Sequence, residues 1–471
     1  MAQLYNIVRL YWPGCGQMPK QRGDNPLCFC FEPSDKNPLI SVDSNGLVVI
    51  NNTEFCCQAV LSRDPREYIR LMAANLYRAL VAYTGQDMPW GSLTGIRPTK
   101  PLYELLGGYD FGNEDVPAAL ETMKERYLVS DTKLRLLRDI IATQKGLVVP
   151  KSLKPINRYI NIPICPTRCN YCSFISHTVS ECKGLIDSYV GVLKRELTMD
   201  TGILNKLGYS IHTIYVGGGT PTVLSAGQLD DLLGAVPKIG VEWTVEAGRA
   251  DTIDDEKLSV LKSHGVTRIC INPQSMSDAT LRAIGRGHTA TDIVRAYDIA
   301  KKYDFVVNMD IIAGLDGETE ADFLYSLGRV LDLKPHNITI HAKSNKRASK
   351  GGGDTPIDAA AADKMMDNVA MLMRDNGYNP YYVYRQKSQL GALENVGYSR
   401  PGYECISNIT TMEESLGVIA CGAGAISKVI SYESNRIERY ANCKEIGMYI
   451  EEFGRRYNEK VKVLEQGQSF G

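Results

Sequence analysis

The chain has 471 residues, more than one hydrophobic core usually organises, so two or three domains are expected. Its 53 Lys and Arg residues nearly balance 54 Asp and Glu residues, so the overall charge indicates neither a nucleic-acid partner nor a membrane-surface partner. No run of about 18 apolar residues occurs and the first residues lack the pattern of a signal peptide, so we expect no membrane span and a cytoplasmic location.

Residues 1–150 are predicted to form an N-terminal α+β domain, to which the sequence assigns no role. The first 60 residues have β and loop patterns, and the stretches 65–84 and 115–145 have the apolar spacing of helices. Five cysteines in this part could form a second metal site, but their spacing matches no usual ligand pattern, and we interpret them as ordinary thiols: Cys15, Cys28, Cys30, Cys56 and Cys57.

Residues 151–350 alternate short β-branched runs with amphipathic stretches. Strands are predicted at 158–164, 211–217, 241–247, 266–272, 305–312 and 337–342, with helices between them. Strands joined by helical crossovers form parallel sheets. The sequence therefore predicts an α/β fold whose central domain is a partial (β/α)6 barrel, similar to part of a TIM barrel.

Residues 351–471 are predicted to form a C-terminal α+β extension that covers the substrate side of the barrel. The run "GGGD" at 351–354 indicates a break in regular structure. A helix is predicted at 356–376, a strand at 381–386, a region of glycine-rich loops after it, and a final helix from Ile437 to about Tyr457.

Three cysteines occupy one eight-residue window, Cys165, Cys169 and Cys172 in "CPTRCNYCSF". A closed structural zinc site needs four ligands, so the window is one thiol short of it. Thiolates also hold iron–sulfur clusters, and a cubane bound through three of them keeps one iron open to another ligand. The window follows the first predicted barrel strand, where the functional groups of barrels lie. We therefore favour an iron–sulfur cluster over a zinc-binding module.

Polar residues follow the next four barrel strands at the same end. They are the "GGGTPT" run at 217–222, Glu246, Gln274 and Asp310. Glycines between a strand and a helix either make a tight turn or let backbone amides approach a ligand. A carboxylate in an apolar strand needs a partner. This partner is either a neighbouring arginine or a ligand amine or ribose.

Three arginines are candidates for a role at this end of the barrel. Arg249 and Arg268 are the candidate partners of the two carboxylates. Arg286, in "IGRGHT", is either a solvated charge or, freed by the flanking glycines, a group that reaches the barrel rim.

The motifs together resemble a known family. The CxxxCxxC spacing, with Tyr171 before the third cysteine, resembles the signature of the radical S-adenosylmethionine (SAM) superfamily. "IPICPTRCNYCSF", "YVGGGTPT", "INPQSM" with "IGRGHT", and "DIIAGL" are similar to the oxygen-independent coproporphyrinogen III oxidase family. "WGSLTGIRPTK", "TVEAGRADT" and "YYVYRQKSQLGALENVGYS" resemble its HemZ-type coproporphyrinogen dehydrogenase branch. The resemblance covers nearly the whole chain and implies a radical SAM barrel.

The resemblance implies two cofactors, a [4Fe–4S] cluster and SAM, which is the ligand of the open iron. The implied cluster ligands are Cys165, Cys169 and Cys172. Tyr171 would lie near the adenine, and the SAM amino group would meet Gly217, Gly218, Gly219 and Thr220. The implied contacts of the SAM methionine or ribose are Glu246, Gln274, Arg286 and Asp310. Arg286 suits the carboxylate because a guanidinium can bind it through two hydrogen bonds.

The implied activity is the oxidative decarboxylation of the propionates of coproporphyrinogen III to vinyl groups, which gives protoporphyrinogen IX in haem biosynthesis. The electron for SAM cleavage would come from a low-potential donor of the flavodoxin or ferredoxin type. An anionic tetrapyrrole substrate needs cations, and the candidates are His341, Lys343, Lys346, Arg347 and Arg385.

Three positions depart from the family pattern. Phe174 stands where the oxidases carry a further cysteine, a form shared with relatives that resemble haem chaperones. Asp316 and Ala250 stand where relatives usually have proline. The alternatives are therefore a haem-binding, chaperone-like protein and another radical SAM enzyme that modifies a tetrapyrrole.

Overall fold

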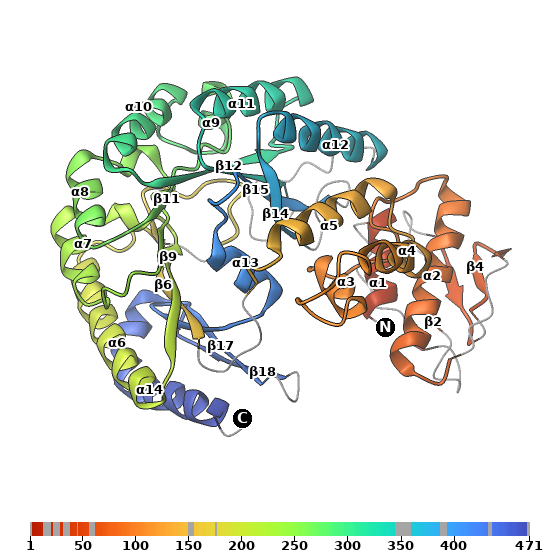
Figure 1. Ribbon diagram of the computed structural model, residues 1–471, viewed down its shortest axis with the longest axis horizontal. Coiled ribbons are helices and arrows are strands. Elements are labelled where there is room, and N and C mark those ends of the chain that lie inside the picture. Colours follow the sequence, from red (N-terminus) through yellow and green to blue (C-terminus); the bar gives the residue numbers. More distant parts are fainter. Residues whose placement is uncertain are drawn as a thin grey trace. The chain divides into compact units, whose positions relative to one another are not determined.

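The computed structural model describes residues 2–12, 20–21, 29–31, 38–44, 46–55, 62–148, 155–174, 177–343, 359–386, 393–431 and 436–468 (Figure 1). The chain forms two compact units. The first comprises Met1–Thr143, Asp354–Asp375 and Val383–Asn395, and the second comprises Gln144–Gly353, Asn376–Tyr382 and Val396–Gly471. The predicted C-terminal extension is thus shared between the two units, and its role as a substrate cover stays a prediction.

The first unit packs helices on a small antiparallel sheet. The sheet contains β1 (Lys20–Gln21), β2 (Phe29–Phe31), β3 (Ile40–Val42), β4 (Val48–Ile50) and β5 (Thr53–Phe55) in sequential order. The helices are α1 (Ala2–Tyr11), α2 (Pro65–Thr84), α3 (Thr99–Leu105), α4 (Val116–Tyr127), α5 (Asp131–Gln144) and α12 (Ala359–Asp375). The predicted α+β class of this part is confirmed.

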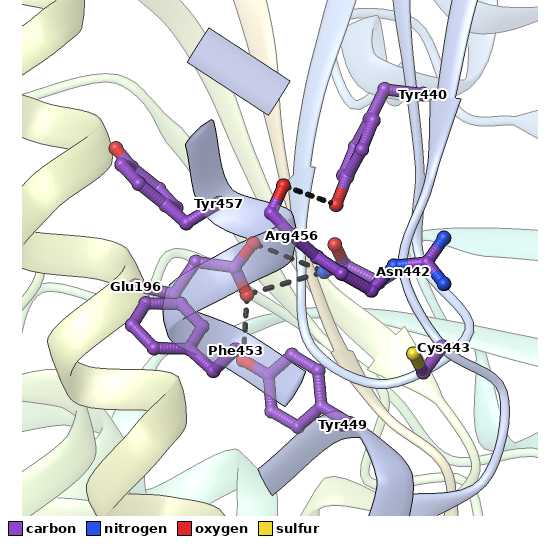
Figure 2. Close-up of a pocket in the computed structure, with 8 residues that line it drawn as sticks. All are labelled: Glu196, Tyr440, Asn442, Cys443, Tyr449, Phe453, Arg456 and Tyr457. Carbon is purple, nitrogen blue, oxygen red and sulfur yellow. Dashed lines mark hydrogen bonds between the residues drawn. The ribbon is translucent and has the colours of Figure 1, made fainter. Parts of the chain in front are cut away.

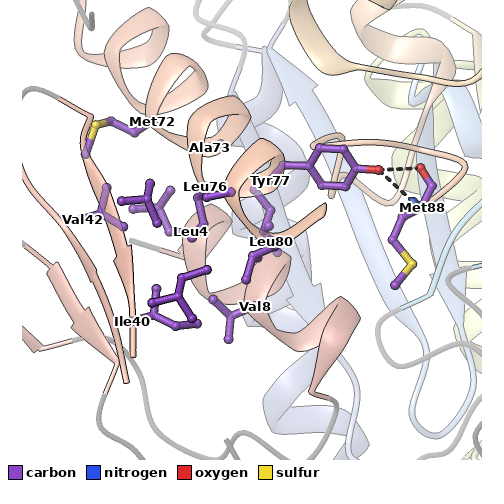
Figure 3. Packing of buried hydrophobic residues seen from close by; sticks show 14 residues of the cluster. Leu4, Val8, Ile40, Val42, Met72, Ala73, Leu76, Tyr77, Leu80 and Met88 are labelled. Carbon is purple, nitrogen blue, oxygen red and sulfur yellow. Dashed lines mark hydrogen bonds between the residues drawn. The ribbon is translucent and has the colours of Figure 1, made fainter. Parts of the chain in front are cut away.

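The core of the first unit lies between α1, α2 and strands β3 and β4 (Figure 3). Leu4 of α1, Ile40 of β3 and Leu76 of α2 are all 1% exposed or less. The helix α2 begins at the residue that the sequence predicts because the Asp64 side chain caps its first turn by accepting from the Arg66 N–H at 2.9 Å. The four thiols Cys15, Cys28, Cys56 and Cys57, and the side chain of Cys30, lie outside the described residues.

The second unit is built on a sheet with six parallel central strands. These are β6 (Pro155–Ile162), β9 (Ser210–Gly218), β10 (Glu242–Val245), β11 (Arg268–Cys270), β12 (Val306–Ala313) and β13 (Asn337–Ala342). All six predicted strands are confirmed within a few residues. Each strand runs parallel to its neighbour, so the carboxyl ends of all six lie at one rim.

Helices connect these strands and lie in an arc on one side of them (Figure 1). They are α6 (Ile186–Lys206), α7 (Ala226–Leu233), α8 (Asp255–Ser263), α9 (Asp278–Ala283), α10 (Ala290–Ala300) and α11 (Glu320–Leu333), with the short 3-10 helices η1 (Pro221–Val223), η2 (Ala250–Thr252) and η3 (Lys301–Tyr303). The partial (β/α)6 barrel predicted from the sequence is confirmed. In the described ranges, no helix combines the length and apolar character needed to cross a membrane.

Later segments extend the sheet at both edges. Beyond β13 lie β15 (Asn395–Ser399) and β14 (Asn379–Tyr384), and beyond β6 lie β16 (Gly417–Cys421), β17 (Ile426–Ser431) and β18 (Arg436–Ala441). The strand β16 runs parallel to β6, whereas β17 and β18 are antiparallel. The helices α13 (Ile406–Glu413) and α14 (Ile446–Gln468) complete this part.

Two predictions for this region are wrong. The expected glycine-rich loops contain the three strands β15, β16 and β17. The helix expected from Ile437 begins at Ile446, because 436–441 pair with β17 as the strand β18. The helix α14 instead packs on α6 around buried charges. The Lys460 ammonium donates to Glu196 at 2.8 Å, to Asp200 at 2.7 Å and to the Ala420 carbonyl at 2.8 Å. Figure 2 shows Glu196 accepting further bonds from Tyr449 and Asn442.

Candidate functional site

The cysteine window forms a loop at the carboxyl end of β6. The short strand β7 (Ile164–Cys165) pairs with β8 (His177–Thr178), and the Cys172 N–H bonds to the Cys169 carbonyl at 3.2 Å. The Asn170 side chain donates to the Ala283 carbonyl at 2.8 Å, which ties the loop to the connection after β11. None of the three cysteines forms a disulfide bond with a described residue, and all three are half-buried.

Negative charge at these thiols is costly without a counter-charge. Burial raises the pKa of the Cys172 thiol, the Phe174 backbone N–H opposes this shift, and the neighbouring Cys169 and Cys165 reinforce it. Two side chains donate to the other sulfurs: the Thr220 hydroxyl lies 3.6 Å from Cys165 Sγ, and Arg249 Nη1 lies 3.7 Å from Cys169 Sγ. The donor set is therefore suited to thiolates that bind a positively charged group.

Among the residues that the structure describes, no group of three or more His, Cys, Asp or Glu side chains is arranged around a point that could hold a single metal ion. The thiolates of a cubane cluster each bind a different iron, so they surround the cluster and do not meet at one point. The three thiols at this loop are compatible with that arrangement.

The glycine run at the end of β9 lies against the cysteine loop. The N–H groups of Gly219 and Thr220 donate to the carbonyls of Ile162 and Ile164, both at 2.8 Å. A Cβ on Gly219 would lie 2.5 Å from the Ile164 carbonyl oxygen, and one on Gly217 would lie 2.7 Å from Glu246 Oε2. Gly218 has a φ of 104°, which an L side chain rarely adopts. The run is therefore glycine because the backbone must approach both neighbours closely.

Glu246 and Asp310 are paired with groups other than the two candidate arginines. Glu246 accepts from the Tyr215 hydroxyl at 2.6 Å and from the Gly218 N–H at 3.2 Å. Burial raises its pKa to about 7 despite these two bonds. Asp310 accepts from the Asn308 amide at 2.7 Å and lies 3.6 Å from His341 Nε2. Burial opposes ionisation of Asp310, but these contacts keep its pKa below the usual value.

The alternative in which Arg249 or Arg268 neutralises these carboxylates is wrong. Arg249 binds Asp251 instead, at 2.8 and 2.9 Å, and Arg268 lies 3.4 Å from Glu242. The partner of Arg249 is two residues away on the same loop, so local geometry decides this pairing.

Gln274 and Arg286 are both buried at the rim, with exposed fractions of 8% and 7%. Gln274 has a φ of 67°, and its N–H donates to the Asp310 carbonyl at 2.8 Å. Arg286 donates through Nη2 to the Tyr171 hydroxyl at 2.8 Å and through Nη1 to the carbonyls of Gly248 and Asn272, at 3.2 and 2.5 Å. The alternative that Arg286 is a solvated charge is therefore wrong. Both Nη atoms of its guanidinium group are hydrogen-bonded to other groups of the chain.

Three buried polar atoms at this rim have no hydrogen-bond partner among the residues that the structure describes: Gln274 Oε1, Arg286 Nε and Asn272 Oδ1. Buried polar atoms are rarely left unsatisfied, because desolvation without a partner costs free energy. An amide oxygen can accept a hydrogen bond from an ammonium or hydroxyl group, and a guanidinium N–H can donate one to a carboxylate. SAM carries all three groups, so the residues present fit it as a ligand.

The structure brings the predicted site residues into direct contacts. Thr220 contacts Cys165, Gly218 contacts Glu246, Gln274 contacts Asp310, and Tyr171 contacts Arg286. Sequence reasoning missed Tyr215 as the partner of Glu246 and Arg249 as a donor to a cysteine. The sequence does contain one indication of the role of Arg249, which is its position three residues after Glu246 on a rim loop.

The candidate cations for a substrate have different surroundings. Lys343 is buried and pairs with Asp316, and His341 faces Asp310. Arg385 belongs to the first unit, where it donates to the Leu93 carbonyl. Lys346 and Arg347 lie outside the described residues. The Phe174 side chain is 67% exposed.

Known proteins share this fold and these motifs. The family model described as "Radical SAM superfamily" matches residues 159–329. The oxygen-independent coproporphyrinogen-III oxidase-like protein HemZ of Bacillus subtilis is 35% identical over 98% of this chain and 95% of its own length. The heme chaperone HemW of Lactococcus lactis is 31% identical over 65% of this chain and 78% of its own length.

A solved structure supports the fold alone. The coproporphyrinogen III oxidase HemN of Escherichia coli, described as a radical SAM enzyme, aligns with a TM-score of 0.52 at 20% identity and covers 66% of this chain and 72% of its own. The full-length similarity to HemZ and the matched superfamily region agree with it. The chain therefore belongs to the radical SAM superfamily, whose cofactors are a [4Fe–4S] cluster and SAM, and within it to the HemZ-type branch of the oxygen-independent coproporphyrinogen oxidase family.

Proposed function

We propose that the chain is a cytoplasmic radical SAM oxidoreductase that converts propionate side chains of coproporphyrinogen III to vinyl groups. The observation that carries this proposal is the rim itself. A three-thiol loop, a close-packed glycine run and buried polar atoms without partners lie among residues that match the family motifs.

The residues have distinct proposed roles. Cys165, Cys169 and Cys172 hold the cluster, and the glycine run with Thr220 holds SAM close to it. In its ionised form Glu246 accepts from the SAM ammonium group. Arg286 orients Tyr171 through the 2.8 Å bond and donates through Nε to the SAM carboxylate. Gln274 and Asp310 accept from ammonium or ribose hydroxyl groups.

The bound cofactors supply the ability to remove a hydrogen atom from an unactivated carbon. For each propionate, one β-hydrogen atom and carbon dioxide leave, and a vinyl group remains. One electron enters from a low-potential donor for SAM cleavage, and one electron leaves the substrate for an acceptor. A flavodoxin or ferredoxin is the proposed donor. The buried rim serves this chemistry by excluding water from the reacting carbon.

Among the candidate cations that the structure describes, we propose Lys343 for recognition of a substrate propionate. It is 7% exposed and bound to Asp316, at the position where relatives usually have proline. A propionate would have to displace or share this carboxylate. The Asp316 departure is thus expected to weaken substrate binding and so to favour release of the product.

A haem-binding, chaperone-like function is the second candidate. It is favoured by the similarity to heme chaperone HemW proteins and by Phe174, which replaces a thiol next to the cluster loop. The exposed Phe174 ring can contribute apolar contact to a porphyrin ring or to a partner protein, whereas a cysteine would contribute a reactive thiol.

One anaerobic assay separates these functions. The reconstituted full chain is supplied with coproporphyrinogen III, SAM, a low-potential reductant and an electron acceptor. The proposed function predicts protoporphyrinogen IX, carbon dioxide, methionine and 5′-deoxyadenosine, all absent with the Cys169→Ala variant. Intact propionates together with tight haem binding would favour the chaperone. SAM cleavage that requires another tetrapyrrole would favour a different radical SAM enzyme.

A further inference from the structure

Arg249 places a buried positive charge beside one thiol of the cysteine window. Its side chain is 3% exposed. Its Nη1 atom lies 3.7 Å from Cys169 Sγ and 3.0 Å from Thr167 Oγ1, so this nitrogen points into the loop. Among the described side chains, it is the one arginine with a hydrogen bond to a sulfur of this loop.

The guanidinium is held from its other side by two acidic oxygens. Asp251, on η2, accepts from Arg249 Nε at 2.9 Å and from Nη2 at 2.8 Å. The His288 Nδ1 atom lies 3.0 Å from the same carboxylate, and the imidazole is buried. A two-bond carboxylate contact fixes the plane of a guanidinium. Arg249 therefore has a set orientation, with its remaining nitrogen directed at Thr167 and Cys169.

This geometry has a consequence for charge. The Asp251 carboxylate lies on the side of the guanidinium away from the sulfur, so the positive end of the ion pair faces Cys169. A hydrogen bond and a positive charge beside a thiolate favour the more negative state of a cluster that the thiolate binds. The more negative state is the reduced one. Second-shell contacts of this kind tune metal centres in general.

We propose that Arg249 is a positioning residue that donates a hydrogen bond to the Cys169 thiolate and raises the reduction potential of the cluster, with Asp251 and His288 holding its orientation. The proposal rests on the proposed role of Cys169 as a cluster ligand. It assigns a function to the "EAGRAD" loop that goes beyond contact with SAM. A higher potential makes the cluster easier to reduce by a given donor.

The test is a redox titration of the anaerobically reconstituted full chain, followed by electron paramagnetic resonance. We expect Arg249→Gln to lower the ratio of reduced to oxidised cluster about tenfold at the wild-type midpoint, a shift of about 59 mV for one electron. Arg249→Lys keeps the charge without the fork, so a smaller shift is expected. Asp251→Asn loosens the guanidinium but also removes a negative charge, and these two effects on the potential are opposed, so a smaller shift than in Arg249→Gln is expected.

Arg268→Gln is the matched control. Arg268 is also buried and paired with a carboxylate, but it has no contact with the three thiols, so its loss should leave the potential unchanged. Wild-type potentials in Arg249→Gln, Arg249→Lys and Asp251→Asn, with normal iron content, would overturn the proposal. If Arg249→Gln does not fold, the other two variants decide. Retention of the cluster in Cys169→Ala would instead overturn the ligand assignment.

Discussion

At the scale of single residues, Cys182 is a matched control for the three thiols of the cysteine window. It follows them closely in sequence but is 2% exposed, and the side-chain donors Thr220 and Arg249 bind Cys165 and Cys169 instead. We expect about four irons per chain after anaerobic reconstitution. Alanine at position 165, 169 or 172 should abolish the iron–sulfur absorption, and Cys182→Ala should retain it. Stoichiometric zinc with no such absorption would contradict the cluster.

Gln274 offers a test of SAM binding that is separable from folding. Its Oε1 atom is buried and has no partner in the described part of the chain, so Gln274→Leu removes no hydrogen bond that the structure shows for that atom. Thermal stability without SAM should stay the same or rise. SAM affinity should fall by about 1 kcal/mol or more, the value of one lost hydrogen bond. Isothermal titration measures it. Arg286→Ala, by contrast, should lower both stability and affinity, because Arg286 binds Tyr171.

Glu246 predicts a pH dependence of SAM binding. Its pKa of about 7 means that it is half ionised near neutrality, whereas the pKa values of Asp310 and Tyr215 keep these groups ionised and neutral respectively between pH 6 and 8. If the carboxylate accepts from the SAM ammonium, affinity should be about tenfold higher at pH 8 than at pH 6. Glu246→Gln should flatten this dependence. Equal pH profiles in the two proteins would contradict the role.

Ionisation of Glu246 is expected to lower the stability of the fold, although it raises the affinity for SAM. Its folded pKa lies above the usual value, so the folded protein binds this proton more tightly than the unfolded chain. Glu246 therefore stabilises the fold below the usual carboxyl pKa and loses this contribution as the pH rises to about 7. Stability without SAM and affinity for SAM should change in opposite directions over this range.

At the scale of elements, the buried ammonium of Lys460 joins α14 to α6, in addition to the bond from Tyr449 to Glu196. Lys460 is 0% exposed and donates to Glu196, Asp200 and the Ala420 carbonyl, which uses all its three protons. Lys460→Met would leave two buried carboxylates short of a counter-charge, so we expect a loss of about 3–5 kcal/mol in unfolding free energy. Lys462→Met, at an exposed position of the same helix, should change it by less than about 0.5 kcal/mol. Chemical denaturation measures both, and equal effects would show that α14 is not anchored this way.

At the scale of the whole molecule, the first unit contains segments from distant parts of the sequence. Lys133 of α5 donates to Glu394 at 2.6 Å and lies 2.8 Å from Asp363 of α12, and Trp90 Nε1 donates to Glu394 at 2.8 Å. A fragment that begins at Gln144 lacks Lys133 and Trp90. We expect limited proteolysis to cut this fragment first within 354–395, whereas the full chain resists there. Cleavage that begins elsewhere in the fragment would contradict this division of the chain.

The parallel core of the second unit can be predicted from local sequence patterns. The stretch 337–342 was predicted as a strand and is β13, and the other five predicted strands match to within a few residues. Each of these strands is an apolar, β-branched run between turn residues, so a local pattern is sufficient to recognise it. The same holds for the cysteine spacing, which names the candidate cluster ligands without any structure.

The edge strands and the partners of the rim residues depend on contacts between segments that are far apart in the sequence. The strand β16 is short and glycine-flanked, and its pairing with β6 joins residues more than 250 positions apart. No local pattern specifies such a pair. The sequence likewise names Glu246, Arg249 and Arg286 but not that they bind Tyr215, Asp251 and Tyr171. A side chain takes the partner that lies nearest to it in the folded chain, and that distance exists only after the strands and loops have packed.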